Sequence, residues 1–281
     1  MPAYTVVDGF KCYAPELAEE NGDFDAESFE FLYAIENTNF WFVSRNKVIK
    51  SLVEKYLDKD FSRQNKFLEI GCGTGYVLKG LSGVPNLELE GAEIYLNGLK
   101  FARSRLPDMN LIQLDATKLP FKKTYNAIGA FDVLEHITED ELVMKNIYDA
   151  LKVDGYFFIT VPQYNWMWSK TDDYACHKRR YSRKELVTKL QSKGFKIEYI
   201  SSFMFTLFPL MIFSRFVTGK KSIAKDEHNK QPPELNLNPV LNAVLRCMMR
   251  LDELLIGLRI SLPFGGSLVV VAKKAGHTTG F

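Results

Sequence analysis

Phe67-Leu-Glu-Ile-Gly-Cys-Gly-Thr-Gly-Tyr76 is the stretch that decides the fold. Its first four residues are apolar except for one glutamate, which predicts a short buried strand. The three glycines that follow allow a sharp turn and a close approach of the backbone to a ligand. A helix beginning near Tyr76 would aim its free N–H groups and the positive end of its dipole at that ligand. The stretch therefore predicts a nucleotide-like cofactor at the carboxyl edge of a parallel sheet.

Strand patterns alternate with helical patterns on both sides of this stretch. A clear amphipathic helix is predicted over 44–58, and a shorter helical pattern covers 27–36. Further strands are predicted over 87–94, 109–116, 125–136, 155–161, 195–200 and 266–273, and further helices over 97–106, 139–151 and 183–193. This alternation predicts an α/β protein with a seven-stranded, doubly wound, mostly parallel sheet and helices on both faces.

The connection between the sixth and seventh strands is much longer than an ordinary loop. It holds an apolar run over 203–216 and a polar loop over 220–233. A helix follows that places these residues on one face: Leu241, Val244, Leu245, Met248, Leu251 and Leu255. We interpret 203–263 as an inserted helical cap. The expected organisation is an N-terminal arm and substrate-side helix over 1–44, a cofactor-binding domain over 45–202 plus 264–275, and this cap.

Composition narrows the class of protein. The chain has 281 residues, 46% of them hydrophobic and 25% charged, and its net charge of +2 gives no reason to expect a nucleic-acid partner. The four cysteines are scattered, with no histidine at ligand spacing, so we expect neither a metal site nor a disulfide framework. The first residues show no signal-peptide pattern, and no apolar run is long enough to span a membrane. These features predict a cytoplasmic protein.

The glycine spacing indicates which cofactor is bound. A nicotinamide-binding turn has the spacing G-x-G-x-x-G, whereas this one has G-x-G-x-G and is preceded by Glu69. A carboxylate at that position would repel a pyrophosphate but suits a cofactor that carries an ammonium group. The pattern therefore favours S-adenosylmethionine, and a nicotinamide-dependent oxidoreductase is the less favoured interpretation.

Four pieces of sequence, in order, carry a resemblance to a known family. They are the motif Glu69-x-Gly-x-Gly-x-Gly75, Glu93, Leu114-Asp-Ala116, and Phe131-Asp-Val-Leu-Glu-His136. Together they resemble the class I S-adenosylmethionine-dependent methyltransferases, in particular the small-molecule branch that includes ubiquinone-pathway and sugar methyltransferases. The resemblance covers about residues 64–201, and the seventh strand rejoins it. It implies a Rossmann-like methyltransferase fold and transfer of a methyl group to an oxygen or nitrogen of a small molecule, leaving S-adenosylhomocysteine. Sugars, lipid-linked saccharides and quinone-like lipids are the acceptor classes that we expect.

The resemblance also implies roles for the residues of the glycine turn. Gly71 and Gly73 would let the backbone lie against the methionyl part of the cofactor. Cys72 and Gly75 belong to the same cofactor-binding turn. Glu69 would lie near the ammonium group of the cofactor.

Five residues at the ends of the next strands are implied cofactor contacts. Glu93 would accept hydrogen bonds from both ribose hydroxyls, because a carboxylate offers two acceptor oxygens and no donor. Ile94 would pack against adenine, Asp115 would accept from its amino group, and the Ala116 N–H would meet the ring. Phe131 would offer its carbonyl to the ammonium group. The alternative is that the carboxylates are merely polar ends of strands.

Two histidines are candidate catalytic residues. Methyl transfer depends mainly on alignment, but an oxygen or nitrogen nucleophile benefits from a base. His136 follows the fourth strand, and an ordinary histidine pKa near 6.5 suits a base. The alternative for His136 is a capping or substrate-positioning role. His177, in the loop after the fifth strand, is the second candidate, and a structural role is its alternative.

The acceptor is expected to meet aromatic and basic side chains. Tyr164 and Trp166 would form an aromatic wall, and Arg179 and Arg180 would bind a carboxylate or phosphate. The structural alternative places Arg180 at the start of the following helix, where Ser182-x-x-Glu185 predicts a capping box. Trp41, within an aromatic cluster, would line the substrate pocket or else pin the N-terminal arm to the surface.

The apolar run over 203–216 has three alternative roles, and each implies a different partner. It would be the core of the cap, a dimer face, or an interfacial helix that meets a bilayer or a lipid-linked acceptor. Lys220 and Lys221 follow the run, and exposed apolar area bordered by basic residues would favour the interfacial helix. We therefore expect a monomer or homodimer, with peripheral contact at the inner membrane surface as one possibility. The alternative function is a catalytically silent binding module that keeps the fold and acts through its cap.

Overall fold

The computed structural model describes residues 3–18, 28–57, 64–218 and 237–275. Within them, the centre is a nine-stranded sheet in the order β1-β2-β5-β4-β3-β6-β7-β9-β8. The strands are β1 (Thr5–Val7), β2 (Phe10–Cys12), β3 (Asn65–Ile70), β4 (Leu87–Glu93), β5 (Asn110–Gln113), β6 (Tyr125–Phe131), β7 (Leu151–Pro162), β8 (Phe195–Phe203) and β9 (Ser267–Lys274).

All seven predicted strands are present, and the doubly wound fold class is confirmed. Strands β5, β4, β3, β6 and β7 run parallel, whereas β9 runs antiparallel between β7 and β8. The sheet nevertheless has two more strands than we predicted. β1 and β2 form an antiparallel hairpin, and β2 extends the sheet by pairing in parallel with β5. Strands of three residues are too short to show the alternating pattern that identifies a strand.

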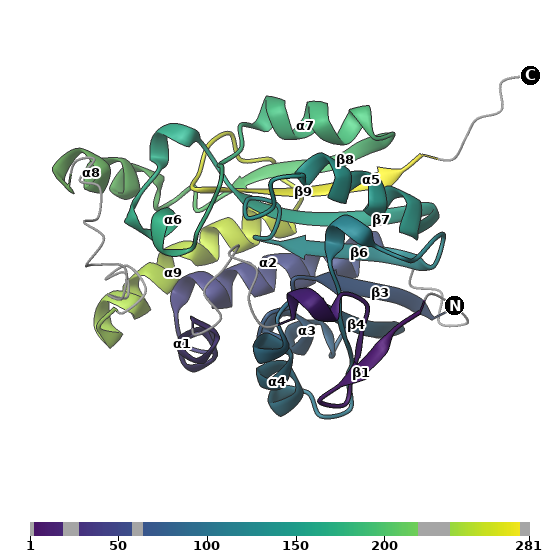
Figure 1. Ribbon diagram of the computed structural model, residues 1–281. Helices are drawn as coiled ribbons and strands as arrows, with labels where there is room; N and C mark the ends of the chain where they lie inside the picture. The colour runs from purple at the N-terminus through teal and green to yellow at the C-terminus, as the bar shows by residue number, and fades with distance from the viewer. Residues whose placement is uncertain (1–2, 19–27, 58–63, 219–236, 276–281) are drawn as a thin grey trace, which may run out of the picture.

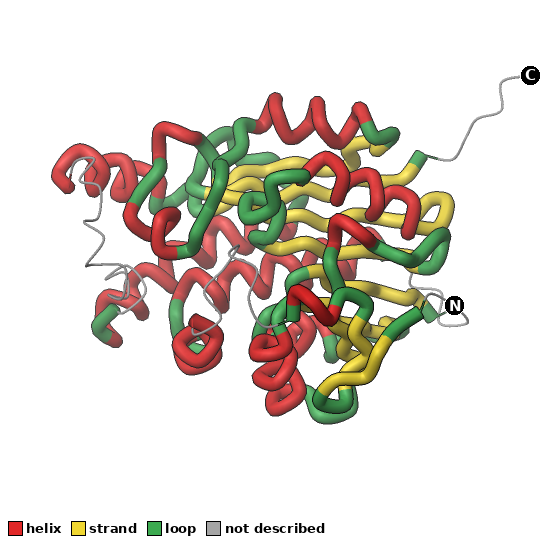
Figure 2. The backbone as a smooth tube through the Cα atoms, viewed as in Figure 1, coloured by secondary structure: helices red, strands yellow, loops and turns green. Residues whose placement is uncertain are grey.

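Helices cover both faces of the sheet (Figures 1 and 2). Alternation along β3 shows how the faces are divided: Phe67 packs with α2 and α9 on one side, and Leu68 and Ile70 pack with α5 and α7 on the other. The helices are α1 (Ser28–Ile35), α2 (Phe40–Tyr56), α3 (Tyr76–Leu81), α4 (Leu96–Arg105), α5 (Asp140–Ala150), α6 (Lys170–Tyr174), α7 (Arg183–Ser192), α8 (Phe208–Thr218) and α9 (Pro239–Gly257).

Helix α2 begins earlier than the sequence pattern predicted. Asn39 is its N-cap, and the Asn39 side chain accepts a hydrogen bond of 3.0 Å from the backbone N–H of Trp41. The aromatic cluster around Trp41 is therefore the first turn of α2 and not a segment that precedes it. At α7, by contrast, Ser182 and Glu185 form the predicted capping box.

The insertion between β8 and β9 is helical, and it shares a core with the rest of the domain. Helix α9 packs along α2, with Leu245, Met249 and Ile256 in the hydrophobic cluster that contains the apolar face of α2. Asp252 is also buried on this face, and its carboxylate accepts hydrogen bonds from the backbone N–H groups of Phe205 (2.6 Å) and Thr206 (3.1 Å). The insertion is thus joined to the sheet domain along the length of α9.

The apolar face that we predicted for α9 is largely exposed. Leu241, Val244, Met248 and Leu251 are 40–52% exposed, whereas Leu245 is buried. The helix carries apolar residues over more than one face, so periodicity alone does not identify the face that packs. The predicted polar loop over 220–233, with Lys220 and Lys221, lies outside the described residues, as does Glu27.

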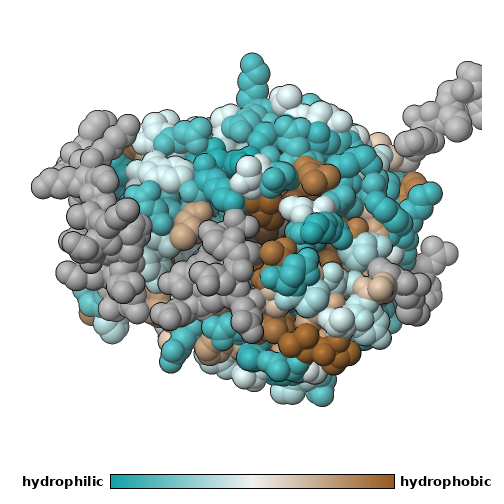
Figure 3. All heavy atoms as spheres, viewed as in Figure 1, coloured by the Kyte–Doolittle hydropathy of each residue, from teal (hydrophilic) through white to brown (hydrophobic). Residues whose placement is uncertain are grey.

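The surface is mixed on the face shown in Figure 3. Hydrophobic side chains gather near the centre of this view and along its lower edge, over the β1–β2 hairpin, between hydrophilic ones. Val6 of β1 is 67% exposed. Among the helices that the structure describes, none is both long and apolar enough to cross a membrane.

Candidate active site

A cavity of about 750 Å³ lies at the carboxyl ends of the parallel strands. Its wall includes the glycine turn after β3 and the ends of β4, β5 and β6, with α1, α2, the segment after β7 and α8 around them. Nine of the ten predicted cofactor residues line this cavity: Glu69, Gly71, Cys72, Gly73, Glu93, Ile94, Asp115, Ala116 and Phe131. Four of the predicted catalytic and substrate residues also line it: Trp41, His136, His177 and Arg180.

The glycine turn has left-handed backbone angles at each glycine, with φ of 68° at Gly71, 50° at Gly73 and 75° at Gly75. A Cβ on Gly71 would also lie 2.4 Å from Cγ2 of Val133. Gly75 is not part of the cavity wall. It is the N-cap of α3, and a Cβ there would lie 3.2 Å from Cβ of Ala102. The structure therefore gives Gly75 a role in turning and packing the chain.

Alanine at Gly71 is expected to lower the free energy of unfolding by about 1–3 kcal/mol, because a side chain is strained at this positive φ. The variant is also expected to bind S-adenosylhomocysteine more weakly, since the turn lines the cavity. Urea denaturation and calorimetric titration measure the two effects. Gly83→Ala is the matched control, because a Cβ there meets only Lys50 Nζ at 3.7 Å and its φ is not left-handed. Equal losses in both variants would contradict the assignment.

Glu93 connects the end of β4 to the glycine turn. Its Oε2 accepts the N–H of Gly73 at 2.9 Å, and its Oε1 accepts those of Ile94 (2.8 Å) and Tyr95 (3.2 Å). Burial raises the pKa of Glu93. A carboxylate offers about four acceptor positions, so these three bonds leave it capacity for a ligand hydroxyl.

Glu69 is buried within the wall of the cavity and is 2% exposed. Its Oε2 has no hydrogen-bond partner among the described residues. Burial raises the pKa of Glu69 well above its usual range, although the charge of Arg45 opposes this shift. A buried carboxylate oxygen without a donor is costly, and a cationic donor in the cavity, such as an ammonium group, would satisfy it.

Asp115 shows that a polar strand end can also face the cavity. Its Oδ1 accepts the backbone N–H of Thr117 at 2.8 Å and caps the short 3₁₀ helix Ala116–Lys118. Asp115 also lines the cavity. The structural role and the predicted contact with adenine therefore do not exclude each other.

A buried polar network fixes α1 to the glycine turn. Glu36 pairs with Arg105 of α4 at 2.8 Å and accepts the Thr74 hydroxyl at 2.5 Å. The Arg105 side chain is 3% exposed, and its guanidinium also lies over the ring of Tyr33, 4.5 Å from the centroid. This network holds one wall of the cavity in place.

A second buried pair holds α2 against the end of β6. Arg45 binds Asp132, which also accepts the hydroxyl of Thr160 at 2.9 Å. The Arg45 guanidinium lies over the ring of Trp41, 4.4 Å from the ring centroid. Trp41 is therefore held on the wall of the cavity by a cation–π contact.

The segment after β7 contributes a buried salt-bridge cluster. Arg180 donates two hydrogen bonds to Asp172, of 2.7 Å from Nε and 2.8 Å from Nη2, and the Nδ1 atom of His177 lies 2.8 Å from Asp172 Oδ1. Although burial opposes ionisation, these bonds from His177 and Arg180 lower the pKa of Asp172 well below its usual range. Arg180 thus makes its bidentate interaction with Asp172 of the protein itself, and not with a substrate group as we predicted.

Three residues that we predicted on the acceptor side lie away from the cavity wall. The rings of Tyr164 and Trp166 stack on each other, with centroids 5.5 Å apart, and both contact Phe208 of α8. Arg179 pairs with Asp140 at 2.9 Å and donates to the carbonyl of Thr138. Tertiary packing determines the direction of a side chain on a loop, and the spacing of residues in the sequence does not reveal that direction.

Comparison with known proteins identifies the family. A family profile described as "Methyltransferase domain" matches residues 42–200, which is more than half of the chain. The chain belongs to this methyltransferase family. Its cofactor is S-adenosylmethionine, and the unpaired Glu69 oxygen and the glycine turn fit the ammonium and methionyl parts of that molecule.

Relatives match over part of their length. This methyltransferase-family chain is 27% identical to malonyl-[acyl-carrier protein] O-methyltransferase of Bacillus anthracis, over 40% of the chain and 43% of that protein. It is 23% identical to demethylmenaquinone methyltransferase of Chlorobaculum tepidum, over 44% of the chain and 49% of that protein. The chain thus spans about half the length of the curated relatives it matches.

Solved structures confirm the Rossmann-like methyltransferase fold. A chain from the complex of the Haloferax volcanii Trm112 methyltransferase activator with its methyltransferase partner gives a TM-score of 0.59 at 15% identity, covering 91% of this chain and 99% of that one. The [4+2]-cyclase SpnF gives 0.53 at 18% identity, covering 82% and 81%. At such identities the likeness concerns the fold alone, and SpnF itself is a cyclase.

Sequence reasoning missed several residues of the cavity wall. Glu135 and Asp132 lie within the quoted motif Phe131–His136, so a carboxylate beside each predicted residue was a usable signal. Arg45 carries no such signal, because its partner Asp132 is distant in the sequence. Asp172 acts through His177 and Arg180 of the same segment, and no spacing rule marks that contact.

Proposed function

We propose that this protein transfers a methyl group from S-adenosylmethionine to an oxygen or nitrogen of a small molecule. The observation that supports this most directly is that one cavity has both the cofactor residues Glu69 and Glu93 and, in a second part of its wall, His136 and His177. A fold kept only for binding the cofactor has no need of titratable side chains in that second part. The silent binding module is therefore the weaker alternative.

The residues of the chain bind, orient and protect the reactants. When bound, S-adenosylmethionine supplies an electrophilic methyl group on a sulfonium. Glu69 would accept the ammonium group of the cofactor, and Glu93 its ribose hydroxyls. His136, which lines the same cavity, is positioned to take the proton of the acceptor. Trp41 and the helices around the cavity exclude water, which favours alignment of the reacting atoms.

The acceptor is proposed to be a sugar, a lipid-linked saccharide or a quinone-like molecule. The inserted segment lines the cavity with apolar side chains, among them Met204, Leu207 and Met211, and so supports an acceptor with an apolar part. On α8, Leu210 and Phe213 are 54% and 66% exposed. We propose that this helix gives peripheral contact with a membrane that holds such an acceptor.

A labelled cofactor tests both the activity and the acceptor class. Purified protein is incubated with S-adenosylmethionine carrying a labelled methyl group and an extract of the source cell, and the mixture is split between organic and aqueous phases. We expect label in a new product, and label in the organic phase identifies a lipid or lipid-linked acceptor. Label in the aqueous phase only would contradict the membrane contact through 203–216.

A thermal-shift screen separates the alternatives. We expect protection by S-adenosylhomocysteine and not by NAD. Protection by NAD alone would favour an oxidoreductase. Protection by S-adenosylhomocysteine, together with no labelled product in any extract, would favour the silent module.

A further inference from the structure

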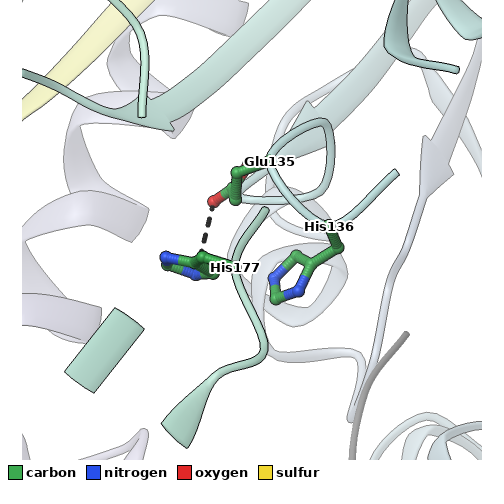
Figure 4. A group of neighbouring side chains, drawn as sticks. All are labelled: Glu135, His136 and His177. Atoms are coloured by element: carbon green, nitrogen blue, oxygen red, sulfur yellow. Dashed lines mark ion pairs between the residues drawn. The ribbon is translucent and has the colours of Figure 1, made fainter. Parts of the chain in front are cut away.

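Three side chains that can ligate a metal meet on the acceptor side of the cavity. Glu135 and His136 lie on the turn after β6, and His177 lies on the segment between α6 and α7 that faces it (Figure 4). One ligand atom from each side chain lies within 4.8 Å of the other two. The rings of His136 and His177 meet edge to face, with centroids 4.7 Å apart. Two imidazoles and a carboxylate thus point to a common place.

Glu135 is the unusual member of this cluster. It is completely buried, and neither carboxylate oxygen has a hydrogen-bond partner among the described residues. Nε2 of His177 lies 3.9 Å from Oε1 of Glu135. A carboxylate buried in this way is strongly unfavourable unless a cation or several donors compensate it. A cation bound in the cavity would satisfy both oxygens of Glu135.

His177 is held in the orientation that a metal ligand needs. Asp172, whose two oxygens are fixed by Arg180, lies 2.8 Å from Nδ1 of His177. An ionised carboxylate only accepts, so Nδ1 donates to Asp172 and Nε2 is the nitrogen that faces Glu135. Histidine ligands in metal sites are commonly held by a carboxylate in this manner.

We propose that Glu135, His136 and His177 bind a divalent transition-metal cation. Two imidazole nitrogens and one carboxylate oxygen suit Zn²⁺, Fe²⁺, Co²⁺ or Mn²⁺, and three protein ligands leave coordination positions open. With bond lengths of about 2.1 Å, ligand atoms lie roughly 3–3.5 Å apart, so binding draws the three side chains closer together. The sequence pattern predicted no metal site, because His177 is far from Glu135 and His136 along the chain.

The site gives the proposed methyl transfer a preferred acceptor, and this part of the inference rests on the proposed function. A metal ion on this wall would bind an oxygen of the acceptor and lower the pKa of its hydroxyl group. A molecule with two neighbouring oxygens, such as a catechol or a vicinal diol, would occupy two open positions. The hydroxyl proton leaves to water, the O–CH₃ bond forms, and the C–S electron pair stays on sulfur. His136 is then a ligand and not the base.

Binding of Co²⁺ tests the site without any methyl transfer. The full-length protein is stripped with a chelator and titrated with Co²⁺, which is followed by calorimetry and by the visible absorption of the bound ion. We expect one Co²⁺ per chain and at least a 10-fold weaker affinity in Glu135→Gln and His177→Ala. Asp172→Asn is also expected to weaken binding by about 10–100-fold, because it no longer orients His177.

The control is Glu141→Gln, which makes the same chemical change at an exposed position of α5 that is not part of the cavity wall. It is expected to bind Co²⁺ as the parent chain does. Binding of S-adenosylhomocysteine by each variant shows that it is folded. No stoichiometric Co²⁺ binding by the parent chain, or equal affinity in Glu135→Gln, overturns the metal site.

The two proposals fail separately. Co²⁺ binding without any labelled product would leave the metal site standing and count against methyl transfer. Methyl transfer at an unchanged rate in the presence of a chelator would uphold the function and overturn the role of the metal in it. Together, we expect activity that a chelator abolishes and that added Co²⁺ or Mn²⁺ restores.

Discussion

Replacing Glu93 with alanine is expected to weaken S-adenosylhomocysteine binding by about 100-fold. A hydrogen bond to a charged group contributes about 1.5–3 kcal/mol, and the variant would lose the proposed ribose contact, for which the carboxylate has an acceptor position left. It also leaves the N–H groups of Gly73, Ile94 and Tyr95 without their acceptor, which loosens the turn under the cofactor. Calorimetric titration of the two proteins with S-adenosylhomocysteine measures the change.

Two companions make the Glu93 result specific. Glu88→Ala changes the same residue type on the same strand, where the side chain is 55% exposed, and is expected to leave the affinity unchanged. Glu93→Gln keeps the size of the side chain and part of its acceptor capacity, so its loss should be smaller than that of Glu93→Ala. Equal affinity in the parent chain and Glu93→Ala would remove the assigned ribose site.

Breaking the buried pair of Glu36 and Arg105 is expected to have the largest effect on stability. Glu36→Ala leaves the guanidinium of Arg105 buried without its carboxylate, and such changes lower the free energy of unfolding by about 3–5 kcal/mol. Thr74 also loses its acceptor, so binding of S-adenosylhomocysteine should weaken as well. Urea denaturation, followed by circular dichroism, measures the stability.

The controls separate burial from charge. Glu54→Ala breaks the exposed pair with Lys50 in α2 and should change the free energy of unfolding by about 0.5 kcal/mol or less. The double variant Glu36→Leu with Arg105→Met replaces the pair by apolar side chains, and should recover much of the stability that the single variant loses. A loss in Glu36→Ala no larger than in Glu54→Ala would show that the pair does not hold α1.

Local signals predicted most of the sheet, and long-range contacts explain what was missed. The strand before Gly71 and the capping box at Ser182 depend on residues that are neighbours along the chain, so the sequence pattern predicts them. The β1–β2 hairpin joins the sheet through the pairing of β2 with β5, which is about 100 residues away along the chain, so no local pattern marks it. On α9, Leu245 is buried and Leu241 is exposed because α2 approaches from one side, and periodicity does not reveal that side.

The two sides of the cavity were predictable to different degrees for a physical reason. Glu69, Glu93 and Asp115 lie at or just after the carboxyl ends of parallel strands, and the fold brings these ends together whatever the loops do. Tyr164 and Arg179 lie on a connecting segment whose direction depends on Phe208 and Asp140. A residue type that suits a substrate is therefore weak evidence on a loop and stronger evidence at a strand end.

The position of β9 has a consequence for synthesis on the ribosome. Strands are made in chain order, but β9 (267–274) lies between β7 and β8, which are finished much earlier. Until β9 emerges, β7 presents an unpaired edge and β8 has no neighbouring strand in the sheet. The cofactor-binding strands β3 to β6 are complete long before that moment. We therefore expect the nascent chain to contain a folded cofactor-binding part beside the unpaired edge of β7. This edge can associate with other chains until β9 pairs with it.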